Sequence, residues 1–439
     1  MGLQLSIAEH FLAHETFWFP WQLDRRGRAY AVPVLVNPQI DDLGRALIRF
    51  ARGKPLGERG AYWLAVQLAN LYGREVAKGS YAERRRWVDL HRDEIVDSAT
   101  KSLEGARFWT KGEKPLRFLA AAKEWAGYLV HGPGFPSFQP IVMDGTCNVL
   151  QHLSALGRDR EGGFWTNLVP GPKPQDLYQQ VADRLVVRIE KDIVRGVRLA
   201  ALWKPLIDRK LVKQATMTTP YGVKPKSIWD QLLEVISDRE RQFPSDHAAV
   251  MYIAPHLLAA IDEVMVKGAE IAMWLRPIAR EFARKGQCVS WTTPMGFPVL
   301  NDYRRRRKHR VQTIRRTLVI YERPNEAKHD TTKEIDAVVA NLIHSLDAAH
   351  MMLTVAALKA AGLSDFAMVH DSYAVHACDV DLMHKILREQ FIRVHEQFTL
   401  GGFVEALRRA APPGVVVPDP PPLGSLNLAD VMASEYFFS

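Results

Sequence analysis

Two aspartates, Asp144 and Asp371, each follow a short apolar stretch, "PIVM" in the first case and "FAMV" plus a histidine in the second. An ionised carboxylate in an apolar segment is costly unless it is paired or bound to a metal. For "FAMVHDSYAVHA", residues 366–377, a tight turn between two strands is the simple interpretation, and a metal ligand is the alternative. If the two segments lay side by side, their carboxylates would suit Mg²⁺, which prefers oxygen ligands. Two such ions could clamp the attacking and leaving oxygens of a phosphoryl transfer.

A second pattern lies in "DRKLVKQATMTTPYG", residues 208–222. Arg209, Lys213, Met217 and Tyr221 recur every four residues, so a helix would place them along one slowly drifting stripe. An arginine and a lysine one turn apart can hold a triphosphate, and the tyrosine would then lie near the sugar. The alternative is a solvated basic face with Tyr221 packed at the helix end.

The elements that must position these residues are mostly helical. The periodicity predicts few strands, many helices and no regular alternation of the two, which indicates a helix-rich α+β fold. The segment 411–424 is rich in proline and should be an extended linker. We expect strands in 288–322 and helices in 5–16, 58–130, 173–195, 200–217, 226–241, 254–285, 333–361 and 380–397.

The composition restricts the class of protein. The chain has 439 residues, 47% of them hydrophobic, and a net charge of +9, which favours a polyanionic partner. Cys147, Cys288 and Cys378 are widely separated, so no disulfide framework or zinc motif is predicted, and a reducing compartment fits. No apolar run reaches the roughly 18 residues that a membrane span needs, and the N-terminus lacks the basic region of a secretory signal.

Several further segments follow one another along the chain. They are "FPWQLDRRGRAYAVP", with an Asp-x-x-Gly-Arg element, and then "ARGKPLG", "MDGTCNVLQHLSALGRD", "RKLVKQATMTTPYG", "WTTPMGFPV", "LIHSLDAAH" and "VHDS", with an aromatic tail after "LNL". In their order and spacing these segments resemble the bacteriophage-type and mitochondrial single-subunit DNA-directed RNA polymerases. The likeness runs from about residue 5 to the last residue.

The resemblance implies roles for individual residues. Asp144 and Asp371 would be the catalytic carboxylates that bind two Mg²⁺ ions, with the Gly145 carbonyl as a further ligand. Lys213 would contact the nucleotide phosphates and protonate the leaving group. The other nucleotide contacts would be Arg209 at the triphosphate, Tyr221 in ribose selection and His344 near the 2′-hydroxyl. The residues that would brace the template and hybrid are Asp24, Arg26, Arg28 and Tyr30.

The same likeness implies a right-hand polymerase. Residues 1–160 would form the first part of the palm, 161–344 the fingers, and 345–439 the second part of the palm. The basic run "RRRRKHR", residues 304–310, would tip a hairpin within 288–322 at the position of the family's promoter-reading loop. A two-stranded ribbon fits the major groove of DNA, whereas most basic runs are merely solvated.

Three features depart from the family, and one group of residues has an alternative interpretation. Val149 stands where the family usually has glycine and could crowd the nucleotide site. Pro220 should end or kink the helix before Tyr221. His344, Asp347 and His350 could suggest zinc, but His350 would lie about 240° around a helix from His344. Family members carry several hundred further residues upstream, so this chain could be a fragment, half of a split enzyme with a separate N-terminal polypeptide, or a reduced polymerase.

We therefore predict a DNA-directed RNA polymerase that uses a DNA template, an RNA product and ribonucleoside triphosphates, with no membrane. A related family A DNA polymerase and a non-catalytic nucleic-acid-binding remnant are the alternatives. The "HDS" sequence, in place of His-Asp-Glu, argues against the first alternative, and the full set of catalytic residue types argues against the second. We expect a cytoplasmic location in a bacterial or phage-infected cell rather than in a mitochondrion.

Overall fold

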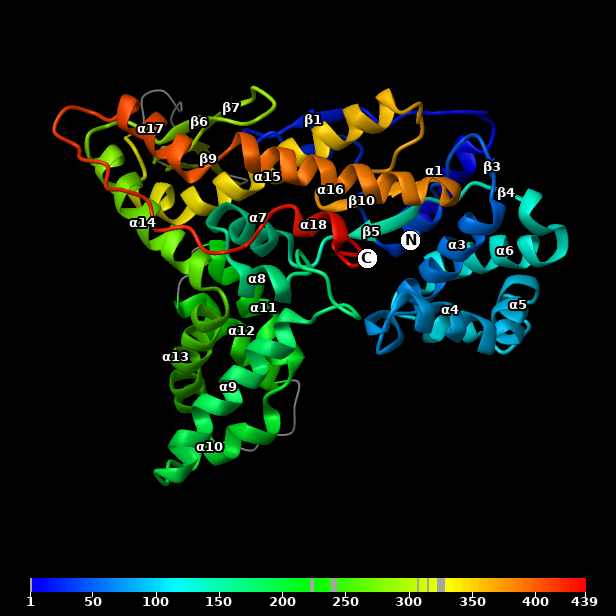
Figure 1. Ribbon diagram of the computed structural model, residues 1–439, viewed down its shortest axis with the longest axis horizontal. Helices are drawn as coiled ribbons and strands as arrows, with labels where there is room; N and C mark the ends of the chain where they lie inside the picture. The colour runs from blue at the N-terminus through cyan, green and yellow to red at the C-terminus, as the bar shows by residue number, and fades with distance from the viewer. Residues whose placement is uncertain (1, 222–224, 238–242, 306–307, 314–315, 322–327) are drawn as a thin grey trace.

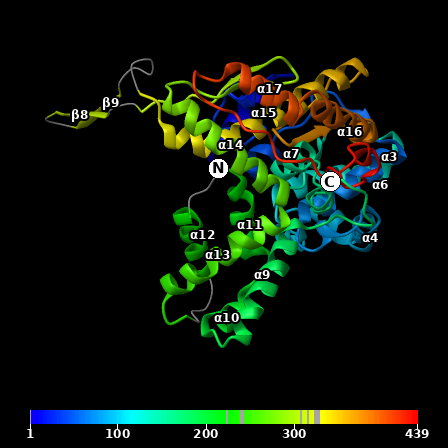
Figure 2. The same ribbon diagram turned by 60° about the vertical axis from the view of Figure 1, so that its left-hand side comes forward.

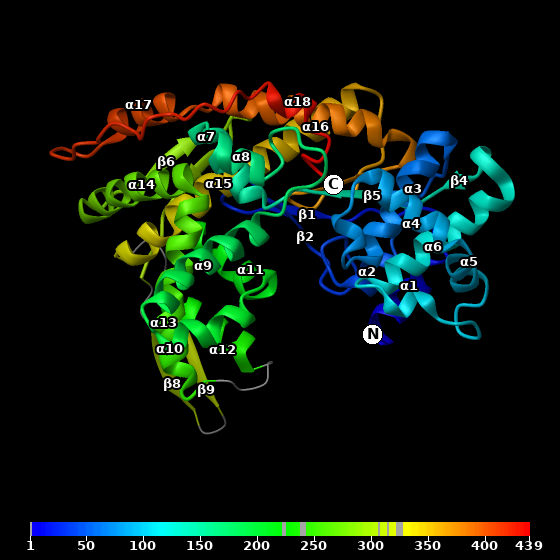
Figure 3. The same cartoon turned by 60° about the horizontal axis from the view of Figure 1, so that its bottom comes forward.

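The computed structural model describes residues 2–221, 225–237, 243–305, 308–313, 316–321 and 328–439. Helices dominate it, and its described strands form five two-stranded sheets, so the predicted helix-rich α+β class is confirmed. Two helical lobes lie apart, with the long helices α15 and α16 running along one side of both (Figures 1 and 3).

The first lobe follows an N-terminal helix and a small hairpin. The predicted hairpin or loop around "DRRGR" is a pair of strands, β1 (Trp21–Leu23) and β2 (Ala29–Ala31), in antiparallel register. The predicted helical stretch 58–130 is confirmed as four helices that pack into one lobe (Figure 1). The remaining elements of this part are α1 (Gly2–Phe11), α2 (Asp42–Ala46), β3 (Lys54–Pro55), α3 (Gly57–Tyr72), α4 (Tyr81–Leu90), α5 (Arg92–Thr100), α6 (Pro115–His131) and β4 (Pro136–Ser137).

The second lobe begins after β5 (Ile141–Asp144) and two short helices, α7 (Asn148–Gly157) and α8 (Arg160–Trp165). The predicted helix 200–217 is interrupted near Pro205, because proline cannot donate the backbone hydrogen bond that a continuous helix needs. The predicted helix 254–285 is two helices that meet at an angle of 104°. The lobe contains α9 (Leu177–Val194), α10 (Arg198–Trp203), α11 (Arg209–Thr218), α12 (Pro225–Ser237), α13 (Asp246–Val264) and α14 (Val266–Arg284).

Helix α15 (Thr331–Ala360) joins two hydrophobic cores. Val338 and Leu342 belong to the core of the second lobe, and Met351 and Leu358 belong to the core that lies beneath the first lobe. A helix that is apolar all round is buried in a core or in a membrane. Within the described residues α15 alone is long and apolar enough to span a bilayer, or with it the bent pair α13 and α14, and 78% of its apolar window is buried. That burial identifies α15 as a core helix.

The segment 288–322 contains two hairpins. Strands β6 (Ser290–Thr292) and β7 (Pro298–Leu300) form the first, and β8 (Lys308–Gln312) and β9 (Thr317–Tyr321) form the second, which projects away from the body (Figure 2). The described residues of the basic run lie before and within β8. The prediction that this run tips a hairpin is therefore wrong, because the β8–β9 turn begins only after Gln312.

The C-terminal part returns to the first core. Strand β10 (Ser372–Val375) is followed by α16 (Val380–Gln397), as predicted, and by α17 (Leu400–Ala410), which the periodicity did not reveal. The proline-rich segment 411–424 has no regular secondary structure, in agreement with the predicted linker. After it, α18 (Asp430–Ala433) and the buried rings of Phe437 and Phe438 return the chain to β5.

Candidate active site

The two aspartates lie at the same end of one pair of strands. Strands β5 and β10 are antiparallel, and Ser372 is the register partner of Asp144. The Gly145 amide donates to the Asp371 carbonyl oxygen over 3.0 Å. The sequence prediction that these distant segments lie side by side and bring both aspartates together is confirmed at the level of the backbone.

Asp371 occupies a tight turn. Val369 and Ser372 exchange two backbone hydrogen bonds of 2.8 Å, and His370 between them has a φ of 52°. The segment "FAMV" does not itself pair with β5; the pairing strand begins after Asp371. The turn and the ligand interpretations are therefore compatible, because the turn holds the carboxylate beside the end of β5.

The Asp-x-x-Gly-Arg loop braces this turn from one side. The Asp24 carboxylate accepts hydrogen bonds from the backbone amides of Arg26 and Arg28, over 2.8 and 3.1 Å, and from the Arg26 guanidinium. Burial opposes ionisation of Asp24, but these donors outweigh it and lower its pKa. Tyr30 accepts a hydrogen bond from Arg26 and contacts the His370 ring edge-on, with 4.8 Å between ring centres.

Arg28 reaches a buried carboxylate behind the turn. Its guanidinium donates to Asp347, on α15, over 2.6 and 2.7 Å, and Asn148 donates to the other Asp347 oxygen over 3.0 Å. Burial raises the pKa of Asp371 to about 7, and the negative charges of Asp347 and Asp144 act in the same direction. A carboxylate in such surroundings would gain from a nearby cation.

His344 lies against the same loop. Arg26 donates to its Nδ1 over 2.8 Å, so the proton of the neutral ring lies on Nε2. Burial and then the charges of Arg28 and Arg26 lower the pKa of His344 to about 2. His350, in contrast, contacts the Leu387 carbonyl and the Tyr373 hydroxyl, so its ring has other partners than that of His344.

A cleft opens on the other side of Asp144. Asp144, Arg209 and Lys213 line the same cavity, whose volume is about 1100 Å³ including its open mouth. Arg209 is held by Asp176, which caps α9, over 2.6 Å, whereas Lys213 is exposed on the next turn of α11. The stripe predicted from the spacing therefore does face the first aspartate.

The prediction that the helix ends before Tyr221 is confirmed, whereas the role of Tyr221 stays a prediction. Helix α11 ends at Thr218 and continues as a short 3₁₀ turn, Thr219–Tyr221, which contains Pro220. The proline prevents a regular α-helix from reaching the tyrosine. The side chain of Tyr221 lies outside the described part of the chain, so its predicted contact with ribose is not tested. Val149 is partly buried and packs against the core of the second lobe.

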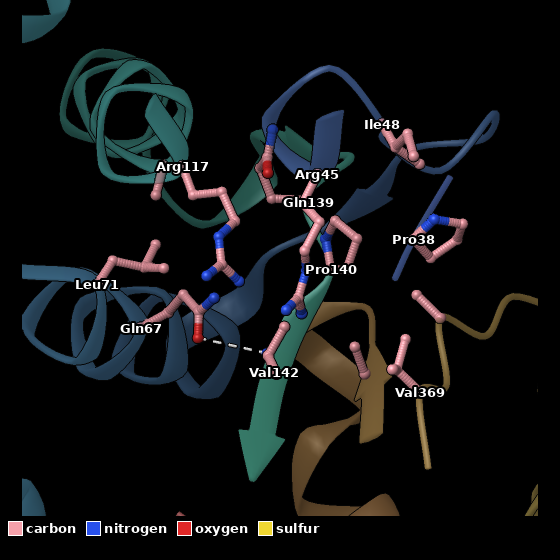
Figure 4. A pocket seen from close by; sticks show the side chains of 13 residues that line it. Pro38, Arg45, Ile48, Gln67, Leu71, Arg117, Gln139, Pro140, Val142 and Val369 are labelled. Carbon is pink, nitrogen blue, oxygen red and sulfur yellow. Dashed lines mark hydrogen bonds between the residues drawn. The ribbon is translucent and has the colours of Figure 1, made fainter. Parts of the chain in front are cut away.

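Sequence reasoning missed a basic wall beside β5. Figure 4 shows Arg45, Gln67 and Arg117 pointing into a pocket around Val142, where Gln67 accepts the Val142 amide hydrogen bond over 3.3 Å. Burial lowers the pKa of Lys114, on the same side, and the negative charge of Asp144 opposes that shift. No spacing in the sequence relates these cations to Asp144, because Arg45 comes from α2 and Lys114 and Arg117 come from the start of α6.

It also missed what the aromatic tail does. The Ser439 amide donates to the Asp144 carbonyl oxygen over 3.1 Å, and Gly145 forms an isolated bridge with Phe438. Gln151 donates to the Phe437 carbonyl over 2.8 Å. A Cβ atom on Gly145 would lie 3.1 Å from the Gln151 side chain and 3.2 Å from the Phe438 ring, so the tail packs closely against the strand end. The only signal for this in the sequence was the aromatic composition of the tail.

Comparisons with known proteins identify the family of the chain. Residues 54–414 match the family model described as DNA-dependent RNA polymerase. The chain is 37% identical over its whole length to the mitochondrial DNA-directed RNA polymerase 1 of Arabidopsis thaliana and covers 45% of that protein. It is 38% identical to the mitochondrial polymerase 1B of Nicotiana tabacum, of which it covers 44%. The chain thus spans less than half the length of these curated relatives.

These relatives correct one prediction and settle another. They are mitochondrial or chloroplastic polymerases of plants, which points to an organelle, so the predicted cytoplasmic location in a bacterial or phage-infected cell is wrong. That prediction rested on the resemblance to phage enzymes and not on any targeting residue. The family model covers most of the chain, and the relatives match it throughout. The chain therefore belongs to the family of single-subunit DNA-dependent RNA polymerases.

Proposed function

We propose that the chain is the catalytic region of an RNA polymerase that adds ribonucleotides to an RNA 3′ end on a DNA template. The observation that carries this proposal is the β5–β10 register, which puts Asp144 and Asp371 at one strand end beside a basic cleft. Two carboxylates next to a cationic wall suit a triphosphate substrate better than a neutral one.

The residues at the strand end fit two Mg²⁺ ions. Asp144 and Asp371 would hold them, with the Gly145 carbonyl as a further oxygen ligand. The raised pKa of Asp371 supports this, because a carboxylate whose ionisation is opposed by burial and by neighbouring charges gains most from a cation. When bound, the ions would stabilise the negative charge on the attacking and leaving oxygens.

Side chains that line the cleft or lie near it would bind and orient the nucleotide. Arg209, fixed by Asp176, would hold the triphosphate, and Lys213 would contact it one turn away and give a proton to the leaving pyrophosphate. His344 would offer its Nε2 proton to the ribose 2′-hydroxyl, since Arg26 donates to Nδ1. Tyr221 would assist in ribose selection.

The nucleic acids would lie along the Asp-x-x-Gly-Arg loop and the projecting hairpin. Asp24, Arg26 and Tyr30 are joined by hydrogen bonds, Arg28 is paired with Asp347, and the Tyr30 ring contacts His370 in the turn before Asp371. In the proposed role they would brace the template and hybrid through that rigid frame. The β8–β9 hairpin carries Lys308 and Arg310 on an exposed ribbon that fits a major groove.

The positions of the two aspartates and of α11 suggest the division into domains. Residues 1–160 and 345–439 would form the palm, because they contain both aspartates and the first core. Residues 161–344 would form the fingers, with α11 facing the palm across the cleft. Helix α15 crosses this boundary and contributes side chains to both cores, so it would connect the two domains.

Primer extension tests the proposal against its alternatives. The chain is incubated with an RNA primer on a DNA template, Mg²⁺ and either ribonucleotides or deoxyribonucleotides. We expect extension with ribonucleotides, and none in Asp144→Asn. Preferred extension with deoxyribonucleotides would indicate a DNA polymerase. Tight binding of primer–template without any extension would indicate a non-catalytic remnant.

A second comparison tests the need for further polypeptide. The relatives are more than twice as long, and a separate N-terminal polypeptide could supply the surfaces that open a duplex. We expect the isolated chain to extend a preformed primer better than it starts on a promoter-bearing duplex at matched salt. Efficient and specific unaided initiation would show that this part of the protein suffices.

A further inference from the structure

A second group of metal-ligating side chains lies away from the aspartate pair, at the base of the β8–β9 hairpin. Asp302 follows β7 where the chain leaves towards the hairpin, His329 lies where the chain returns, and Glu334 is in the first turn of α15. The isolated bridge between Arg304 and His329 joins the outgoing and returning strands at this level. Three segments thus contribute one ligand residue each.

The geometry points to a binding site for a single Zn²⁺ ion formed by Asp302, His329 and Glu334, and we propose that this ion fastens the hairpin to α15. One ligand atom from each residue lies within 4.8 Å of the others. The His329 Nδ1 is 2.7 Å from a Glu334 oxygen and 3.8 Å from an Asp302 oxygen. Tetrahedral ligands about 2.0 to 2.1 Å from zinc are roughly 3.3 Å apart, so small rotations would accommodate the ion.

The burial of Glu334 is the second observation that favours a cation. Its side chain is only 1% exposed. One oxygen accepts from the Tyr303 amide over 3.2 Å and faces His329, but the other has no hydrogen-bond donor among the described residues. A buried carboxylate oxygen without a donor is costly, and a metal ion would remove that cost.

The ligand types favour zinc over magnesium. Imidazole is a good ligand for zinc and similar divalent transition metals, whereas Mg²⁺ prefers oxygen ligands and retains water. The His329 proton that now lies between Nδ1 and Glu334 would leave when the metal binds. Arg304 donates to the same Asp302 oxygen over 2.6 Å, and its charge should weaken the affinity without filling the site.

The ion would connect the hairpin to the frame of the candidate active site. Tyr303 lies next to Asp302 in the segment that leads to β8. The Arg25 guanidinium stacks over its ring, 3.8 Å from the ring centre. Arg25 also donates to the Asp302 carbonyl over 2.9 Å, and the next residue, Arg26, contacts His344. A metal at Asp302 would therefore hold the hairpin base and the Asp-x-x-Gly-Arg loop in one arrangement.

Zinc content tests the site without any nucleotide. The full chain is equilibrated with micromolar Zn²⁺ in excess Mg²⁺, passed over a desalting column and analysed by mass spectrometry of the metal. We expect one zinc per wild-type chain. His329→Ala and Glu334→Gln should lose it, whereas His247→Ala, which removes an exposed histidine on α13, should retain it. A wild-type chain without zinc, or equal zinc in all variants, would overturn the proposal.

Two further variants protect this test from misfolding. Asp302→Asn changes a partly exposed side chain and should lose zinc while its far-ultraviolet circular dichroism remains that of the wild type. Arg304→Gln should bind zinc more tightly, because a competing positive charge is removed; weaker binding would contradict the assigned ligands.

If zinc fastens the hairpin base, tryptic cleavage at Lys308 or Arg310 should slow by up to about 100-fold at zinc a hundredfold above its Kd. Cleavage should not respond to zinc in His329→Ala.

Discussion

The two aspartates of the candidate site end the same strand pair but have contrasting surroundings. Asp371 lies in a turn whose neighbours are fixed by protein contacts, and burial raises its pKa to about 7. Asp144 is exposed and lines the open cleft with Lys213. One half of the site is therefore built before any ligand arrives, whereas the other half depends on what enters the cleft.

The contrast extends to the cations. The closed side consists of the Asp-x-x-Gly-Arg loop, the turn around Asp371 and Asp347. There Arg26 contacts Asp24 and His344, and Arg28 pairs with Asp347. The open side is the cleft lined by Asp144, Arg209 and Lys213. There Arg209 pairs with Asp176, and Lys213 is exposed to solvent. Substitution of Arg26 or Arg28 should therefore affect both stability and activity, whereas substitution of Lys213 should affect activity alone. The predictions below test that separation.

The largest effect is expected at Asp371. Asp371→Asn should reduce nucleotide addition by about 10³-fold or more, because several kcal/mol of metal-dependent charge stabilisation are lost. The melting temperature should not fall, since the substitution removes a charge that burial disfavours. Primer–template affinity, which rests on phosphate contacts elsewhere, should remain. Single-turnover extension, calorimetry and filter binding measure the three quantities.

Asp365→Asn provides the control for this variant. Asp365 precedes the same turn but pairs with the exposed Arg52 over 3.3 Å. Its loss should leave extension within twofold of the wild type, about 0.4 kcal/mol. Normal turnover in Asp371→Asn would remove Asp371 from the chemistry and with it the proposed metal site.

A stability effect should dominate at Arg28. Arg28→Gln leaves the Asp347 carboxylate, which is buried, without its cationic partner, and breaking such a pair costs about 3–5 kcal/mol. The double variant Arg28→Gln with Asp347→Asn should recover much of that loss. Urea unfolding measures both. Equal losses in the single and the double variant would show that the pair does not stabilise the closed side.

Lys213→Ala should give the opposite signature. Removing a positioned cation from the triphosphate should lower the extension rate by about 10²–10³-fold, while the free energy of unfolding stays within about 0.5 kcal/mol. Lys210→Ala, one turn away on the exposed face of α11, is the matched control. A comparable loss of rate in Lys210→Ala would mean that general basic charge matters and not the position of Lys213.

Much of the fold and part of the candidate site could be predicted from the sequence. Local patterns located most of the helices, the two apolar segments that end in aspartate and the stripe of Arg209 and Lys213. Propensity could not decide whether "FAMV" or "SYAV" pairs with β5, because both are short and apolar. Only the tertiary contact between the chain segments selects the second.

The closed side was the least predictable part. Asp347 and Asn148 are polar residues on helices, and nothing in their spacing shows that they meet Arg28 behind the turn. The wall of Arg45, Lys114 and Arg117 was equally hidden, because α2 and the start of α6 meet only in the folded chain. Conversely, the basic run 304–310 was locally obvious, but its charge pattern could not show that β8 begins within it.

The buried histidine behind β10 should make the stability of the fold sensitive to acid. His350 is fully buried between the Leu387 carbonyl and the Tyr373 hydroxyl, and burial lowers its pKa to about 4. Its neutral form is favoured in the folded state, so stability is complete above the unfolded pKa near 6.5 and falls as the pH drops towards 4. Each such histidine contributes at most about 3 kcal/mol. Unfolding at pH 7.5, 5.5 and 4.5 should show a shallower decline in His350→Gln and an unchanged decline in His247→Gln.

The smallest expected effect concerns Val149, which lies on α7. The family usually has glycine at this position, so the valine could crowd the nucleotide, but its side chain packs against the core of the second lobe. If packing is its role, Val149→Ala should cost about 1 kcal/mol of stability through lost apolar burial. Val149→Gly should cost about 1 kcal/mol more, because glycine disfavours the helix. The KM for nucleotide should change less than twofold in Val149→Ala, about 0.4 kcal/mol. A fivefold lower KM with undiminished stability would instead assign Val149 to the open side, where its methyl groups would narrow the nucleotide site.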